Sequence, residues 1–226
     1  MRVSPSALLP TPAAASELGG GLAVRDLALE RGGSWLFSDI AFSIPPGTGL
    51  VLRGANGSGK TSLLRILAGL TVADAGTVAW NGEAWRAGNS AQRARSLYVG
   101  HANALKDELT AAENLAEALT FDGLSISDET QYQALDNVGL LARRHVHARR
   151  LSQGQKRRIG LARLALSPKP LWLLDEPTNA LDDDGVAMFS QLVSNHLRAG
   201  GIACIATHVP LAIAAPLAEF QLGAPS

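Results

Sequence analysis

Residues 54–62 have the types and spacing that bind the phosphates of a nucleotide. They match the pattern GxxxxGK followed by Ser or Thr at every fixed position. The glycines let backbone N–H groups turn toward an anion, Lys60 reaches the β- and γ-phosphates, and the Thr61 hydroxyl can bind Mg²⁺. An ordinary glycine-rich turn is the alternative, but a predicted strand before the loop and a predicted helix after it favour a phosphate loop. The nucleotide-binding residues expected are Gly54, Ala55, Asn56, Gly57, Ser58, Gly59, Lys60, Thr61 and Ser62.

Two acids follow a short apolar run at residues 171–174. This is typical of a buried parallel strand that delivers carboxylates to the carboxyl edge of a sheet. Asp175 would hold the Mg²⁺ shell through water, and Glu176 would orient and polarise the water that attacks the γ-phosphate. Alone, such a run is more often a strand end with solvated acids. The phosphate loop earlier in the chain favours the catalytic interpretation.

A histidine follows another apolar strand, predicted at residues 202–206. A lone histidine after a strand is usually a surface or capping residue. Here the strand is expected beside the one that ends in Asp175, so His208 would reach the same sheet edge. Its imidazole could donate a hydrogen bond to the γ-phosphate.

A second anion site is predicted at residues 151–155, Leu-Ser-Gln-Gly-Gln, directly before a helical pattern. Ser152 can cap that helix, whose first N–H groups would face an anion. Residues 143–158 hold seven Lys or Arg and no acid, whereas residues 175–184 hold five acids and no base. A basic run is most often a solvated helix face or a nucleic-acid patch. The preferred interpretation is that part of it helps this segment face a phosphate tail.

The elements that must position these residues can be outlined from the apolar pattern. Residues 1–21 are interpreted as a flexible leader, and alternation from Leu22, with a strand at residues 40–46, indicates an antiparallel start. An apolar strand at 50–52 precedes the phosphate loop, and the pattern from Leu63 to Leu70 indicates the helix after it. Further along, a capping box and a second cap predict two helices, with their caps at Thr110, Glu113 and Ser127.

Composition excludes several classes of protein. The chain has 226 residues and a formal net charge of zero, which gives no global attraction to nucleic acid or anionic lipid. Its most apolar stretches are shorter than the roughly 20 residues of a membrane-spanning helix or are broken by Pro210 and Pro216. The single cysteine, Cys204, excludes an internal disulfide and fits a reducing compartment.

These motifs, in this order, resemble the ATP-binding-cassette (ABC) family over nearly all of residues 22–222. The resemblance implies an α/β P-loop ATPase with a RecA-like core sheet, an antiparallel β subdomain and a helical subdomain at about residues 102–165. It implies ATP and Mg²⁺ as cofactors, with Lys60, Glu176 and His208 as catalytic residues and Thr61 and Asp175 at the metal. It places Asp182 in the D-loop. It also implies a homodimer in which signature residues act on ATP held by the other copy: Ser152, Gln153, Gly154 and Gln155.

Two positions depart from the family pattern. His101 stands where most cassettes have the Q-loop glutamine that contacts magnesium. The first hairpin, Arg31-Gly32-Gly33, lacks the aromatic residue that stacks on adenine. Trp35 could substitute by stacking, although a core or hairpin-packing role is at least as well supported.

Residues 98–115 and 151–177 are similar to the ATP-binding subunits of the bacterial cytochrome c maturation system. This implies a peripheral subunit at the cytoplasmic face of the inner membrane, bound to integral membrane subunits, that powers haem export or release of a loaded haem chaperone without binding haem itself. One alternative is a cassette for another transported substrate. A soluble regulatory, translation-linked or DNA-repair cassette and a nucleotide-binding scaffold without turnover are the others; no nucleic-acid partner is expected. The chain has no room for a second cassette or a long coiled coil, and Glu176 with His208 argue against a scaffold.

Overall fold

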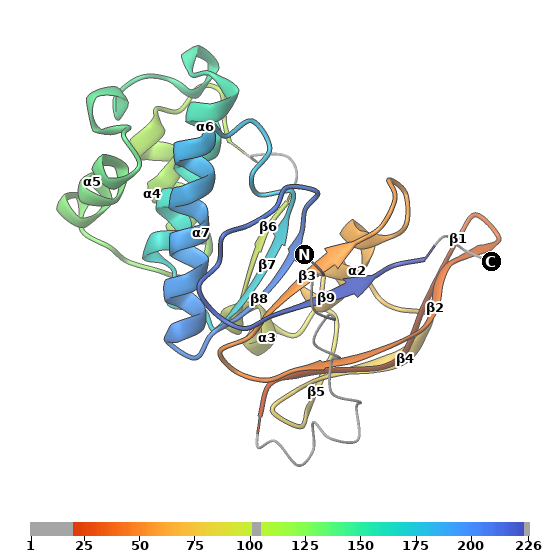
Figure 1. The fold of residues 1–226 in the computed structure, drawn as a ribbon. Helices are drawn as coiled ribbons and strands as arrows, with labels where there is room; N and C mark the ends of the chain where they lie inside the picture. The colour runs from red at the N-terminus through yellow and green to blue at the C-terminus, as the bar shows by residue number, and fades with distance from the viewer. Residues whose placement is uncertain (1–19, 101–104, 224–226) are drawn as a thin grey trace.

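Two β-sheets and a group of helices form the protein, and the computed structural model describes residues 20–100 and 105–223 (Figure 1). The first sheet is antiparallel, with the strand order β2-β1-β4-β5. Its strands are β1 (Leu22–Arg31), β2 (Ser34–Ile44), β4 (Ala75–Trp80) and β5 (Glu83–Trp85). The strand expected at residues 40–46 is therefore the second half of a longer one.

An irregularity in β1 explains the spacing of its apolar residues. Val24 and Leu27 are three positions apart, yet both are buried. Asp26 lies between them with a φ of 48°, and the pairing with β2 shifts register there. The extra residue of this bulge returns the following side chains to the core face.

The second sheet is parallel, in the order β6-β7-β8-β3-β9. Its strands are β3 (Gly49–Arg53), β6 (Ser96–Val99), β7 (Leu171–Asp175), β8 (Ile202–Ala206) and β9 (Leu217–Gln221). In β7, Leu171 and Leu173 pack into one hydrophobic cluster, and Trp172 and Leu174 pack into another on the opposite face. Burial on both faces explains why this strand is a continuous apolar run.

Helices cover both faces of the parallel sheet (Figure 1). On one face, α2 (Lys60–Leu67) packs between the two sheets, and α3 (Ser90–Arg95) precedes β6. The other face is covered by α6 (Gln153–Leu166) and α7 (Asp183–Arg198). Farther out, α4 (Ala111–Phe121) and α5 (Asp128–Asn137) pack against α6, and the 3₁₀ turns η1 (Leu141–Arg143) and η2 (Ala148–Arg150) lie between α5 and α6 in the chain. This arrangement confirms the predicted α/β fold with an antiparallel sheet, a parallel core sheet and a helical region.

The predicted caps are confirmed, and one predicted helix end is wrong. Thr110 and Glu113 form the capping box of α4, and Ser127 caps α5. The helix expected to reach Leu70 ends at Leu67, because Gly69 adopts a φ of 68° and its N–H donates to Ile66 O. Leu70 is left half-exposed in the turn.

Residues 1–19 of the proposed leader lie outside the described residues. Gly21, directly before β1, is bound to the turn between β4 and β5, because its N–H donates to Asn81 Oδ1 at 2.7 Å and its carbonyl accepts from Asn81 N at 2.8 Å. Among the residues that the structure describes, no helix combines the length and the apolar character that crossing a membrane requires.

Candidate active site

The phosphate-loop segment connects β3 to α2, as its sequence predicts. Gly59 caps α2 with a φ of 96°, and a Cβ at this position would lie 2.8 Å from the Phe37 ring. At Gly54 a Cβ would lie 2.6 Å from Ser58 Oγ and 2.8 Å from Leu222 O. Both positions therefore need glycine, since a side chain would collide with the neighbouring strand or with the loop itself.

Lys60 is the first residue of α2, and its ammonium group lies inside the curve of the loop. Nζ donates to Gly54 O at 2.7 Å and to Ala55 O at 3.0 Å. Ser58 Oγ is buried and has no hydrogen-bond partner among the described residues. A cation and an unpaired hydroxyl donor beside the N-terminus of a helix form a setting suited to phosphate oxygens.

Thr61 and Asp175 meet at the carboxyl edge of the parallel sheet. Thr61 Oγ1 donates to Asp175 Oδ2 at 2.9 Å, and Asp175 is buried at the end of β7. A hydroxyl and a carboxylate at this distance supply the hard oxygen ligands that Mg²⁺ prefers, so the residues present fit this metal. Tyr98 of β6 lies nearby, and burial together with the Asp175 charge raises the pKa of its phenol.

Glu176 and His208 follow neighbouring strands, and the structure brings their side chains together. His208 Nε2 lies 3.5 Å from Glu176 Oε1, with the imidazole half-exposed and the carboxylate mostly buried. Glu176 has a φ of 48°, and its N–H donates to Ala206 O at 2.8 Å. The expectation that both groups share one sheet edge is therefore met.

The segment 151–155 lies at the start of α6. Ser152 caps the helix: its Oγ accepts from Gln155 N at 3.2 Å, and Gln155 Oε1 accepts from Ser152 N at 3.0 Å. The side chains of Ser152 and Gln153 are exposed. Within residues 20–100 and 105–223, no hydrogen bond or ion pair connects this segment to residues 54–62.

The D-loop residue Asp182 is positioned by the same helix. A Cβ on Gly154 would lie 2.8 Å from Ala180 O, so the two segments pack main chain against main chain. Arg158 Nη2 donates to both carboxylate oxygens of Asp182, at 2.7 and 3.0 Å. These bonds, with one from Gly185 N, lower the pKa of Asp182.

Sequence reasoning missed a role for Arg157, which it counted only as one of the basic run. Its side chain is 4% exposed, and it donates to the main-chain oxygens of Glu176 and Gly100, the latter at 3.4 Å. A signal was present, because Arg157 shares the buried face of α6 with Leu161 and Leu164 at helical spacing. A cation in a row of apolar core positions indicates a specific buried partner.

The rest of the basic run is partly engaged within the chain and partly solvated. Lys156 Nζ lies 2.9 Å from Asp107 Oδ1, and the Arg144 guanidinium lies 5.4 Å from the centre of the Tyr132 ring. Arg143 is among the exposed members of the run. The expectation that part of the run faces a phosphate is thus refined, since Lys156, Arg157 and Arg158 join segments of this chain.

The two positions that depart from the family pattern have different outcomes. The Q-loop position His101 lies outside the described residues. Trp35 in β2 is 49% exposed, so the alternative in which it packs into the core does not hold.

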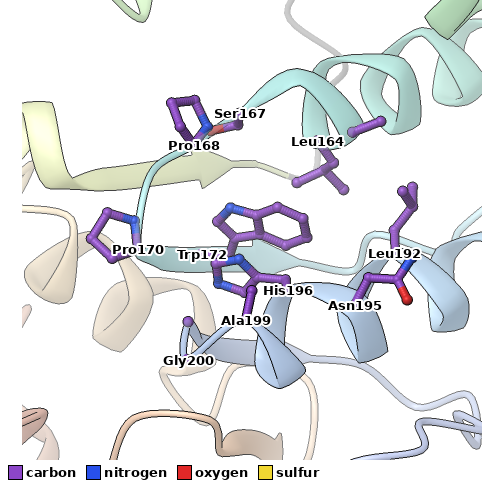
Figure 2. A pocket seen from close by; sticks show the side chains of 12 residues that line it. Leu164, Ser167, Pro168, Pro170, Trp172, Leu192, Asn195, His196, Ala199 and Gly200 are labelled. Carbon is purple, nitrogen blue, oxygen red and sulfur yellow. The ribbon is translucent and has the colours of Figure 1, made fainter.

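The cavity in Figure 2 lies apart from these residues, at the amino ends of β7 and β8. Its volume is about 390 Å³, and it is lined in part by Trp172 and His196, whose rings stack 3.9 Å apart. Burial lowers the pKa of His196, which keeps its ring neutral near pH 7. None of the phosphate-loop residues lines it.

Comparisons with known proteins identify the family to which the chain is similar. The sequence model of the family described as ABC transporter matches residues 37–179. The "Cytochrome c biogenesis ATP-binding export protein CcmA" of Cupriavidus pinatubonensis is 46% identical over 205 residues, covering 88% of this chain and 91% of that protein. A solved structure of a putative ABC transporter ATP-binding protein from Pyrococcus furiosus is similar with a TM-score of 0.76 at 21% identity, over 89% of this chain and 96% of that one. A dimeric ATP-binding cassette in a post-hydrolysis state, bound to ADP and phosphate, is similar with a TM-score of 0.73 at 22% identity, over 83% and 88% of the two chains.

Proposed function

The chain belongs to the ABC transporter family of ATPases, and we propose that it is the ATP-hydrolysing subunit of an exporter used in c-type cytochrome biogenesis. The observation that carries this proposal is the high identity to a protein named for that role, over nearly the full length of both chains. The phosphate loop and the paired acids supply the chemistry. The transported substrate is haem, or the energy is used to release a loaded haem chaperone.

In the proposed mechanism, residues 54–62 hold the phosphates of ATP. Lys60 turns from the loop carbonyls toward the β- and γ-phosphate oxygens. The N–H groups at the start of α2, which form the positive end of the helix dipole, also face these oxygens. Thr61 and Asp175 would hold Mg²⁺, Asp175 through water, and the bound ion would supply positive charge beside the phosphates. Ser58 in the loop and Ser62 in the first turn of α2 complete the contacts to the phosphates.

Glu176 acts as the general base in this proposal. Its carboxylate accepts a proton from the water as the water oxygen bonds to the γ-phosphorus. The bond from that phosphorus to the bridging oxygen breaks in line, and ADP leaves. His208 is half-exposed beside it and donates a hydrogen bond to a γ-phosphate oxygen. The imidazole and the carboxylate lie 3.5 Å apart. His208 can therefore contact a γ-phosphate oxygen while Glu176 contacts the water that attacks the same phosphate.

A second copy of the chain completes the site. Ser152, Gln153, Gly154 and Gln155 lie at an exposed helix start, where the capped N-terminus of α6 suits the phosphates held by the partner copy. Arg158 of α6 binds Asp182 in the neighbouring D-loop, so the D-loop stays beside the start of this helix when the two copies associate. The dimer associates peripherally with integral membrane subunits at the cytoplasmic face of the inner membrane. These subunits, and not this chain, contact haem.

The test is deletion of the coding sequence in its own host, followed by complementation with variants. Wild type restores covalently bound haem in membrane fractions, and Glu176→Gln does not. Glu129→Gln, an exposed acid in α5, is the matched control and restores staining. Normal c-type cytochromes in the deletion strain would refute the role in cytochrome biogenesis, while the ATPase activity of the purified protein would be judged separately.

A further inference from the structure

Arg157 connects three parts of the molecule through main-chain oxygens. It extends from α6, the helix that begins at the signature residue Ser152. Its Nη2 group donates to the carbonyl of Glu176, directly after β7, and its Nη1 group donates to the carbonyl of Gly100, directly after β6, at 3.4 Å. One guanidinium group therefore joins the signature helix to the ends of two neighbouring strands.

The residue held in this way has an unusual backbone. Glu176 is not glycine, yet its φ is 48°, a left-handed conformation that is strained for residues other than glycine and persists only where the surroundings impose it. Its N–H is fixed by Ala206 O at 2.8 Å. Its carbonyl is fixed by Arg157 and also accepts from Asn179 N at 3.3 Å. The N–H and the carbonyl of the residue are thus both bound, and these bonds set the direction in which its side chain leaves the main chain.

Electrostatics allow an arginine at this buried position. Burial lowers the pKa of Arg157, and the nearby charges of Asp175 and Glu176 oppose this shift. The guanidinium of arginine holds two nitrogen donors at separate, fixed positions, one for each carbonyl, whereas lysine has a single nitrogen on a flexible stem. The geometry therefore requires the shape of the side chain as well as its charge.

We propose that Arg157 is a positioning residue for ATP hydrolysis, which holds the main chain of Glu176 so that its carboxylate faces the γ-phosphate. It acts through Glu176 and contacts no substrate itself. Because the same side chain is carried by α6, a movement of the signature helix changes the position of the general base. This inference rests on the proposed ATPase function and adds a residue to it.

The experiment compares Arg157→Gln and Arg157→Lys with the control Arg143→Gln, which removes an exposed arginine of η1. The full-length chain is recovered with its membrane complex, and kcat and KM for ATP are measured. For Arg157→Gln, kcat falls about 100-fold, as expected for a catalytic group displaced by about 1 Å. KM stays within roughly threefold, because the phosphate loop is unchanged. Arg157→Lys recovers little of the loss, and the control behaves as wild type.

A second readout does not depend on turnover. Amide hydrogen exchange of the peptides that contain Glu176 and Gly100 becomes faster in both Arg157 variants and stays unchanged in Arg143→Gln. Equal exchange in all variants, or a wild-type kcat in either folded Arg157 variant, overturns the proposal. A rise in KM with an unchanged kcat also overturns it. If Arg157→Gln fails to fold, Arg157→Lys is decisive, and absence of ATPase activity in wild type refutes the proposed function while hydrogen exchange still tests the positioning role.

Discussion

A buried cluster of charges should make Asp122→Asn one of the most destabilising single substitutions in the helical region. Asp122 ends α4, and its carboxylate is 3% exposed. It accepts from Arg163 at 2.7 and 2.9 Å and from Lys169 Nζ at 3.1 Å. Asparagine keeps the shape but leaves two cations without their counter-charge.

The size of the effect follows from that burial. Breaking a buried ion pair costs roughly 3 to 5 kcal/mol. The lower end applies here, because Arg163 keeps 19% exposure and asparagine can still accept one hydrogen bond. With a urea m-value of about 2 to 3 kcal/mol/M, a loss of about 3 kcal/mol lowers the unfolding midpoint by about 1 to 1.5 M.

The assay is urea unfolding followed by far-ultraviolet circular dichroism at pH 7. The control is Asp136→Asn in α5, where an exposed acid should change stability by less than about 0.5 kcal/mol. The two cations lower the pKa of Asp122 despite burial. Its contribution is therefore complete above the unfolded pKa of about 3.9 and is lost as the pH falls through the folded value. A midpoint shift no larger than that of the control, or a difference that vanishes between pH 8 and pH 5, would refute this reasoning.

Three further predictions concern the site and the core. Glu176→Gln should retain ATP binding, lower kcat by roughly 10²- to 10⁴-fold and trap an ATP-bound dimer, which gel filtration with ATP would detect; a wild-type kcat contradicts its role as base. Lys60→Ala should weaken ATP binding roughly 10- to 100-fold in a binding titration, the loss expected for a charge-assisted contact; equal affinity contradicts the assignment of the loop. Burial raises the pKa of the Cys204 thiol, so it should resist alkylation at pH 8 in the folded protein and react only in denaturant, as mass spectrometry would show; rapid alkylation of native protein would show that this strand opens.

Local patterns were sufficient to predict where the loop at residues 54–62 lies and which polar side chains share the carboxyl edge of the sheet. The loop is contiguous, and the rule that parallel strands present their carboxyl ends at one edge brings Asp175, Glu176 and His208 together. Capping boxes are equally local, which is why Thr110 and Ser152 are predicted correctly as caps.

The contacts that sequence reasoning missed are those that join distant segments. Asp122 meets Arg163 and Lys169, which lie more than 40 positions along the chain. Arg157 in the basic run looks like any other surface cation until the end of β7 is placed beneath it. At Leu70 the error was of another kind, because an apolar residue extended the helical pattern past the glycine that ends the helix.

Helix α6 carries both the signature serine and the arginine that binds the main chain of Glu176. Ser152 caps its exposed start, and Arg157 lies five positions later, about 7.5 Å along the axis, on the buried side. An ATP phosphate bound by the cap in the dimer would therefore pull on the same rigid element that holds the main chain of Glu176 in this copy. In the proposed mechanism Glu176 acts on the ATP of its own phosphate loop, so nucleotide at one composite site would help to align the base at the other. We therefore expect Ser152→Ala in one copy of a mixed dimer to lower hydrolysis at both sites, whereas independent sites would lose activity at only one.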